Sequence, residues 1–192
     1  MSEAHVAARY RALRESGLVT KGGRGPFAPE MTALDAARLL IAVMGAQAIA
    51  ETGAITTILG GADCVVCEDD GDGGVLAEAF GDLVFEKAVA KVLQACLAFR
   101  LGHPRDYVRM VRGITISLSP TALTATIARD GVVAIFRPTR AAGASSDLAV
   151  AERLWRRPDH TGLQIQVSIE APELLELAPS LGPSNAVYRP TH

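Results

Sequence analysis

The sequence predicts an α+β protein in which a helical N-terminal part is followed by a small antiparallel sheet with flanking helices. Apolar residues recur at helical spacing over roughly the first hundred positions, and from residue 113 they alternate with polar residues. Of the 192 residues, 49% are hydrophobic, which is ample for a core and excludes a wholly disordered chain. Only 5% are aromatic, so the core is expected to consist mainly of Ala, Val, Leu and Ile.

The first helix is predicted over residues 3–16. Val6, Tyr10 and Leu13 fall on one helical face, and Gly17 is a typical C-terminal stop. Three basic side chains of this helix lie off that face: Arg9, Arg11 and Arg14.

Further helices are predicted after it. Thr32, followed three positions later by Asp35, is a capping-box pattern, so a second helix is expected to begin there and to end at Gly45. Another helix is expected over residues 46–59, and a long one over 77–101, where apolar residues recur at spacings of four and three.

Strands are predicted in the C-terminal part. Alternation over residues 113–136, interrupted by turn residues, predicts a three-stranded meander, and residues 163–169 alternate again as a fourth strand. Short helices are expected over 148–157 and 172–177, and the last residues, 183–192, are expected to form a frayed tail.

The expected organisation is a helical, DNA-binding region over residues 1–104, an α+β module over 105–182 and the tail. Within the first region, residues 60–74 contain five glycines and a cluster of acidic residues, which predicts an exposed acidic loop. Because both halves are small, the alternative is that they share one core.

Charge is distributed unevenly along the chain. Nineteen basic and 21 acidic residues give a net charge of −2, which excludes a uniformly basic nucleic-acid binder but allows a local basic patch. Residues 1–42 carry a net charge of +2, residues 43–90 of −8, residues 91–140 of +6 and residues 141–192 of −2. An acidic segment therefore separates two basic ones.

Neither a secretory signal nor a membrane span is predicted. The start Met-Ser-Glu-Ala-His has no basic and apolar signal pattern, and the longest helical apolar run, residues 39–50, is shorter than the roughly 20 residues that a membrane helix needs. Three cysteines, an odd number, do not indicate a disulfide framework. We expect a soluble, cytoplasmic protein.

A candidate nucleic-acid interface combines the first helix with the segment that follows it. Lys21 and Arg24 stand among glycines, which let a backbone approach a phosphate closely while the cations attract it. A helix that carries arginines can lie in the major groove, where Arg recognises guanine edges. The alternative is an ordinary helical hairpin with solvated arginines. The predicted DNA-binding residues are Arg9, Arg11, Arg14, Lys21 and Arg24.

The order of segments between residues 9 and 46 carries a family resemblance. Arg-Ala-Leu-Arg-Glu-Ser-Gly-Leu-Val over 11–19 precedes a basic glycine loop and then Met-Thr-Ala-Leu-Asp-Ala-Ala-Arg-Leu-Leu over 31–40. This order resembles the helix, wing and following helix of winged helix-turn-helix regulators, the MerR type in particular. It departs from that family over residues 26–29, Pro-Phe-Ala-Pro, where a Tyr-Arg pair is typical. The segment is also similar to uncharacterised prophage and phage-derived cluster proteins of GC-rich bacteria.

Other motifs do not predict a metal, cofactor or catalytic site. Cys64 and Cys67 have the spacing of half a zinc site or of a redox dithiol, but no second pair exists and the acidic residues that follow disfavour a thiolate. We expect these cysteines to be buried or incidental. Residues 68–79 lack the Glu that closes a calcium loop. Nucleophile-elbow, phosphate-loop and zinc-protease motifs are absent from the sequence, so no enzyme activity is predicted.

These observations predict a sequence-specific DNA-binding transcriptional regulator, associated with a phage or mobile element, that takes double-stranded DNA as its partner. Regulators of palindromic sites are commonly dimers, so we expect a homodimer. The strands of the C-terminal module would form its interface, bind another protein, or both. The alternative is a non-enzymatic interaction or assembly protein of a phage-like gene cluster, with an exposed sheet edge or apolar helix face.

Overall fold

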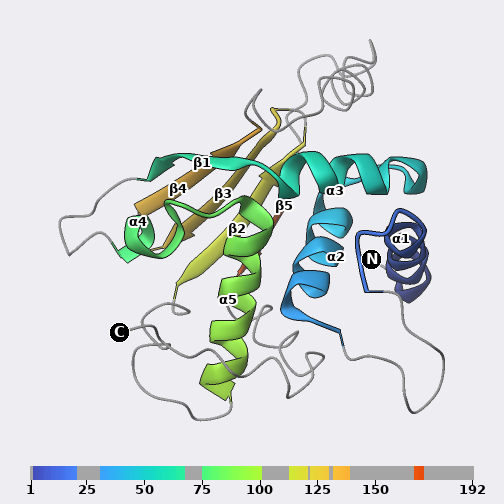
Figure 1. The fold of residues 1–192 in the computed structure, drawn as a ribbon, viewed down its shortest axis with the longest axis horizontal. Helices are drawn as coiled ribbons and strands as arrows, with labels where there is room; N and C mark the ends of the chain where they lie inside the picture. Colours follow the sequence, from blue (N-terminus) through green and yellow to red (C-terminus); the bar gives the residue numbers. More distant parts are fainter. Residues whose placement is uncertain are drawn as a thin grey trace.

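Helices precede and flank an antiparallel sheet in the computed structural model, which describes residues 2–20, 31–67, 75–100, 113–120, 122–129, 132–138 and 167–170 (Figure 1). The predicted α+β class is confirmed. The helices are α1 (Glu3–Glu15), α2 (Ala33–Gly45), the 3-10 helix η1 (Ile49–Glu51), α3 (Thr52–Gly60), α4 (Val75–Phe80) and α5 (Phe85–Arg100). The strands are β1 (Asp63–Cys67), β2 (Ile114–Ser119), β3 (Thr124–Arg129), β4 (Val132–Arg137) and β5 (Val167–Glu170).

Gly17 terminates helix α1, as the sequence predicts. Gly17 has a φ of 73°, which costs glycine little because it has no Cβ. Its amide donates to the Arg14 carbonyl at 3.2 Å, and the Leu18 amide donates to the Leu13 carbonyl at 3.0 Å. This pair of bonds is a Schellman motif, which satisfies the last carbonyls of the helix and turns the chain back toward α2.

Helices α2 and α3 approach closely at one glycine. A Cβ on Gly45 would lie 2.8 Å from a methyl group of Ile55 and 3.3 Å from one of Leu59. Both of these α3 residues are fully buried, so the absent side chain at Gly45 is what lets α3 pack against the end of α2. Helix α1 lies at the periphery, on the side of α2 and α3 away from the sheet (Figure 1).

The sheet has the strand order β1-β4-β3-β2-β5, and each neighbouring pair is antiparallel. Strands β2 to β4 form the predicted meander. The helices pack on one face, where Phe85 at the start of α5 lies 5.2 Å from Phe136, measured between ring centroids. Two rows of buried side chains cross this face, namely Leu118, Ala125 and Phe136, and Ile116, Ile127 and Ala134.

A strand replaces part of the expected acidic loop over residues 60–74. Residues 63–67 form β1, which pairs with β4, and Ala62 is fully buried. A segment next to an acidic run resembles a loop in the sequence, but pairing with β4 satisfies its backbone and places its cysteines against the core. The expectation of an exposed loop is therefore wrong for residues 62–67.

The single helix expected over residues 77–101 is two helices. Helix α4 ends at Phe80, a turn follows, and α5 begins at Phe85, whose amide donates to the Ala62 carbonyl at 2.9 Å. In one continuous helix, the side chains of Phe80 and Phe85 would point about 140° apart around the helix axis. The turn at Gly81 and Asp82 instead allows both phenylalanines to be fully buried.

The two halves of the chain share one core, the alternative that the sequence left open. One cluster of buried residues extends from Ala33 in α2 to Phe136 in β4, and β1 from the first half is a strand of the sheet. A boundary near residue 104 therefore does not separate two hydrophobic cores. None of the helices among the described residues is long and apolar enough to cross a bilayer.

Several predicted features lie outside the described residues. They are the basic glycine segment 21–30, the acidic residues 68–74, the arginine-rich residues 101–112, the helices over 148–157 and 172–177, the start of the fourth strand at 163–166 and the tail 183–192.

Candidate nucleic-acid interface

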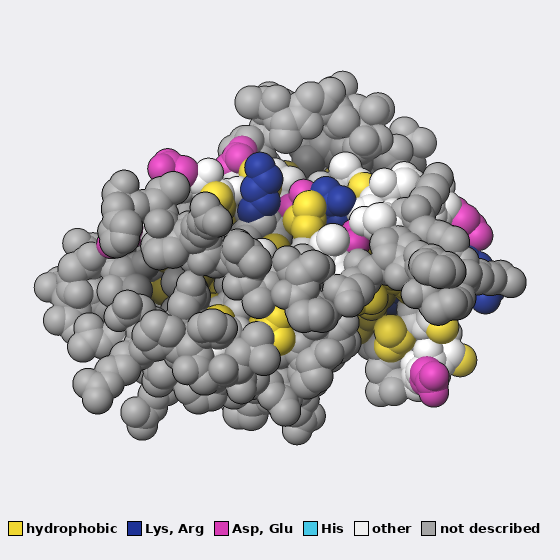
Figure 2. Space-filling model, turned by 60° about the horizontal axis from the view of Figure 1, so that its bottom comes forward, with side chains coloured by type: hydrophobic (Ala, Val, Ile, Leu, Met, Phe, Trp, Pro, Cys, Tyr) yellow, Lys and Arg dark blue, Asp and Glu magenta, His cyan; other side chains and the backbone are white. Residues whose placement is uncertain are grey.

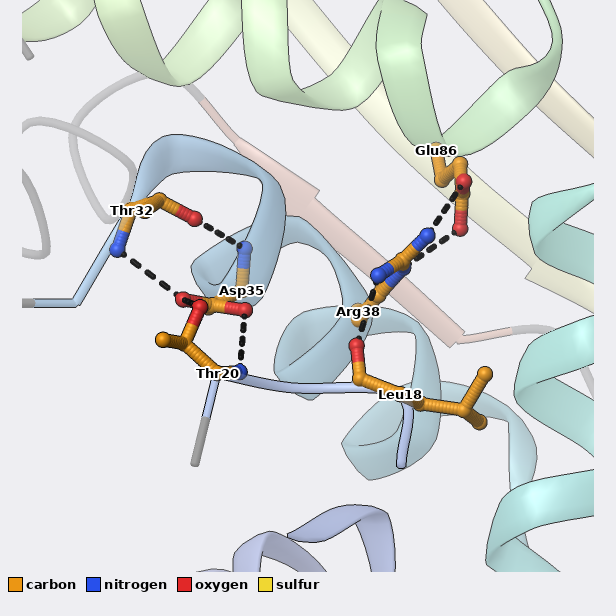
Figure 3. Close-up of polar contacts among 6 residues, drawn as sticks. All are labelled: Leu18, Thr20, Thr32, Asp35, Arg38 and Glu86. Carbon is orange, nitrogen blue, oxygen red and sulfur yellow. Dashed lines mark hydrogen bonds and ion pairs between the residues drawn. The ribbon is translucent and has the colours of Figure 1, made fainter. Parts of the chain in front are cut away.

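One carboxylate binds Thr20 and Thr32, which lie on either side of residues 21–30, here called the basic segment (Figure 3). Asp35 accepts hydrogen bonds from the amide of Thr20 at 3.0 Å and from its hydroxyl at 2.9 Å, on the N-terminal side of that segment. It also accepts from the amide of Thr32 at 3.2 Å, on the C-terminal side. We call this set of contacts the Asp35 bridge.

The Asp35 bridge includes the predicted capping box. The Thr32 hydroxyl accepts from the Asp35 amide at 3.0 Å, so both bonds of the box are formed. The same carboxylate thus begins α2 and fixes the chain that leaves α1. Burial by itself raises the pKa of Asp35, but the hydrogen bonds from Thr20 and Thr32 outweigh it and leave the pKa below 3.8.

A second contact fixes the chain just before Thr20. Arg38, one turn along α2 from Asp35, donates to the Leu18 carbonyl at 2.6 Å. It also binds both carboxylate oxygens of Glu86 on α5, at 2.8 and 2.9 Å (Figure 3). Both side chains are largely buried, and the hydrogen bonds to Glu86 raise the pKa of Arg38, so the guanidinium stays charged. Arg38 therefore joins α2, α5 and the end of α1.

Arg9 occupies a different place from the one that the sequence predicts. It is only 8% exposed, and its guanidinium donates to the Ala46 carbonyl at 2.7 Å. Ala46 is the C-cap of α2, where carbonyls lack helical partners and a cation is favourable. Helix α1 thus turns Arg9 inward, together with Leu13 one turn later. Arg9 joins α1 to α2, which leaves little of its guanidinium for a phosphate.

The remaining candidate residues are divided between α1 and the basic segment. Arg11 is exposed on α1, and Arg14 is half-buried and has an interaction partner within the structure. Lys21 and Arg24 lie outside the described residues. Among the candidate residues that the structure describes, Arg11 is therefore the one whose side chain is exposed.

Charges on the described surface are mixed. On the face drawn in Figure 2, the basic side chains of the described residues stand among acidic ones and do not form a continuous basic area. On α1 itself, the exposed Arg11 is accompanied by the exposed Glu3 and Glu15.

An open groove of about 580 Å³ lies between the C-terminal end of α1 and the residues of η1 and α3. Its lining is mostly small and apolar, and Ile49 within it is 47% exposed. Glu15 is the one ionisable side chain among the described residues that line it. A single carboxylate supplies neither an acid–base pair nor a ligand set, so the groove is not a candidate catalytic centre.

The long-range contacts that fix this region have no signal in the sequence. The capping box is a local pattern, but the bonds from Thr20 to Asp35 and from Arg38 to Glu86 join positions 15 and 48 residues apart. Comparisons with known protein families, with curated proteins and with solved structures find no match for this chain. The geometry of the chain itself must therefore indicate its function.

Proposed function

We propose that this protein is a DNA-binding transcriptional regulator that contacts double-stranded DNA through the outer side of α1 and the basic segment. The supporting observation is the Asp35 bridge, which holds Thr20 and Thr32, the residues on either side of a segment that contains Lys21 and Arg24. A segment held at both ends loses less conformational entropy on binding than a free one, so more of its phosphate attraction becomes affinity.

The proposed contacts divide into two kinds. Lys21, Arg24 and the glycine backbone between them would bind phosphates, which supplies affinity independent of sequence. Arg11, exposed on α1, would reach a base edge or a further phosphate, and Arg14 would assist from its half-buried position. Arg9 is assigned a structural role because its guanidinium is bound to Ala46.

We further propose that the regulator acts as a homodimer in the cytoplasm and belongs to a phage or mobile element. Two copies would place two α1 helices on the half-sites of a palindrome, and half-site spacing follows from the symmetry of the dimer. The sequence pattern between residues 9 and 46 supports this proposal.

A charge-matched pair of double variants tests the proposal. Arg11→Ala with Arg24→Ala removes two cations from the proposed interface, and Lys87→Ala with Arg137→Ala removes two exposed cations from α5 and β4. We expect the first variant to bind DNA more weakly, with a salt dependence less steep by roughly 0.9 for each phosphate that the protein no longer neutralises, and the second to bind like the wild type. An equal decrease in affinity in both variants would show that the lost net charge, and not the position of Arg11 and Arg24, causes the weaker binding.

A second candidate function is supported by one specific observation. The edge strand β1 exposes two adjacent large apolar side chains, since Val65 and Val66 are each 43% exposed. An exposed sheet edge is the feature expected of an interaction or assembly protein without nucleic-acid contact. The wild-type protein would then form a protein complex that Val66→Glu abolishes, whereas a Val66→Glu variant that binds DNA as the wild type does would favour the regulator.

A further inference from the structure

A β-bulge changes which way the two cysteines of β1 face. In a regular strand, residues three apart point to opposite faces. Here Cys64 pairs with Phe136 and Cys67 pairs with Ala134, because Val65 is an extra residue opposite the same stretch of β4. Phe136 and Ala134 are two apart and both fully buried, so they share the helix-covered face. Both cysteines therefore face the same side of the sheet.

The two thiols are in contact on this face. The Cys64 thiol donates a hydrogen bond to the Val66 carbonyl at 3.5 Å, and each thiol shifts the pKa of the other, as expected for two sulfurs that lie close together. Both side chains are half-buried against the core, at an edge strand, so a small reagent can still reach them. The third cysteine, Cys96 in α5, is fully buried.

The described residues offer a pair of sulfurs at this position and no closed set of metal ligands. Among the described residues, no group of three or more His, Cys, Asp or Glu side chains comes together. Structural zinc requires four ligands, whereas a disulfide requires only two sulfurs on one face within reach of each other. Cys64 and Cys67 meet the second requirement and not the first.

We propose that Cys64 and Cys67 form a dithiol that a low-molecular-weight disulfide oxidises to an intramolecular disulfide within β1. Cys64 is the attacking residue, because burial raises the pKa of both thiols, but the interaction between them lowers the pKa of Cys64 and raises that of Cys67. Cys67 is the resolving residue. This site is independent of the proposed DNA interface.

The exchange proceeds in two balanced steps. The Cys64 thiolate attacks one sulfur of the reagent disulfide, a protein–reagent disulfide forms, and one reagent thiolate leaves. The Cys67 sulfur, after losing its proton to solvent, then attacks Cys64, closes the Cys64–Cys67 bond and releases the second reagent thiolate. Two protein thiols are oxidised, and one reagent disulfide is reduced to two thiols.

The bulge determines the distance that a Cys64–Cys67 disulfide must bridge. Two residues along a strand span about 6.8 Å, and disulfide Cα atoms are usually separated by about 4.4–6.8 Å. Since the bulge gives Cys64 and Cys67 the span of two residues, closure requires only a slight tightening at Val65. Without the bulge, residues three apart would span about 10 Å, which a disulfide cannot bridge.

Incubation of the folded full-length protein with oxidised glutathione, followed by intact-mass and peptide analysis, tests the proposal. We expect a monomer lighter by two hydrogens, with a Cys64–Cys67 peptide link. The matched control Cys96→Ser should give the same product. Cys67→Ser should stop at glutathione attached to Cys64, and Cys64→Ser should react more slowly and form no link.

Other products would overturn the proposal. Stable glutathione on both cysteines of the wild-type protein would show that the thiols cannot close, and a disulfide between two chains would show that β1 reacts with a second copy. Absence of any reaction at high pH, while the urea-unfolded chain reacts, would show that the folded edge excludes the reagent. Each of these outcomes is measured on the wild-type protein, so the test does not require that any variant folds.

Discussion

Thr20 and Asp35 are joined by two hydrogen bonds, one from the Thr20 amide at 3.0 Å and one from its hydroxyl at 2.9 Å. Thr20 is the last described residue before the basic segment, and Asp35 lies in the first turn of α2. The contact therefore connects the stability of a helix terminus to the position of the chain that carries Lys21 and Arg24. Changes at Asp35 should affect both.

Asp35→Asn should destabilise the protein by about 1–3 kcal/mol at neutral pH, because an NH2 group would replace one of the two carboxylate oxygens and could not accept a hydrogen bond from Thr20 or Thr32. Urea unfolding of both proteins measures the difference. DNA affinity of the folded variant should also fall, since the ends of the basic segment would no longer be fixed.

The Asp35→Asn difference should depend on pH in a defined direction. The pKa of Asp35 is lower in the folded protein than the ordinary value of 3.8. The charge of Asp35 therefore stabilises the fold fully when the pH is above the pKa of the unfolded chain, and this stabilisation is lost as the pH falls through the pKa of the folded protein. The difference in unfolding free energy between wild type and variant should therefore narrow below about pH 4. A difference that stays constant down to about pH 2 would exclude the carboxylate charge as its cause.

Arg38→Met should cost about 1–3 kcal/mol of stability, since it leaves the Glu86 carboxylate and the Leu18 carbonyl without their donor. Lys87→Ala, at the exposed position next to Glu86, is the control and should change stability by less than about 0.5 kcal/mol. Equal effects in thermal or urea unfolding would contradict the assigned role of Arg38.

Arg9→Met should lower stability and spare DNA binding. The variant keeps an apolar stem but lacks the bond to the Ala46 carbonyl, so we expect a decrease of about 1–2 kcal/mol. Arg11→Ala, on the exposed side of the same helix, should show the opposite pattern, with stability nearly unchanged and DNA affinity reduced. Binding measured per folded molecule separates these results, and a large decrease in affinity in Arg9→Met would return Arg9 to the interface.

Disulfide formation at β1 should be slow near neutral pH and accelerate as the pH rises. Burial raises the pKa of Cys64, and burial together with the neighbouring Cys64 raises the pKa of Cys67 to about 11. Because the thiolate is the nucleophile, the rate should rise by up to about tenfold per pH unit below the Cys64 pKa. Closure that is already fast and independent of pH near neutrality would contradict these raised pKa values.

Local patterns predict much of this fold. The capping box at Thr32, the stop at Gly17 and the alternation of β2 to β4 depend on residues close in sequence, and the structure confirms all three. Strand β1 escapes prediction because its partner, β4, is about seventy residues away and because the bulge at Val65 breaks the alternation that signals a strand.

The candidate site is harder to predict from the sequence. Arginine on a surface helix is usually exposed, and only the position of the α2 C-terminus explains why Arg9 is buried. The bonds of Asp35 to Thr20 and of Arg38 to Glu86 depend on how α1, α2 and α5 pack. Periodicity shows which face of a helix is apolar, but it does not show which distant carbonyl or carboxylate a polar side chain will meet.

The central claim, that α1 and the basic segment contact DNA, is tested most directly by a fluorescence-anisotropy titration of the wild-type protein with random duplex DNA at low and moderate salt. We expect saturable binding that weakens steeply as salt increases, because released counterions drive phosphate contacts. Absence of binding even at low salt would contradict the claim and favour the protein-interaction function of the β1 edge.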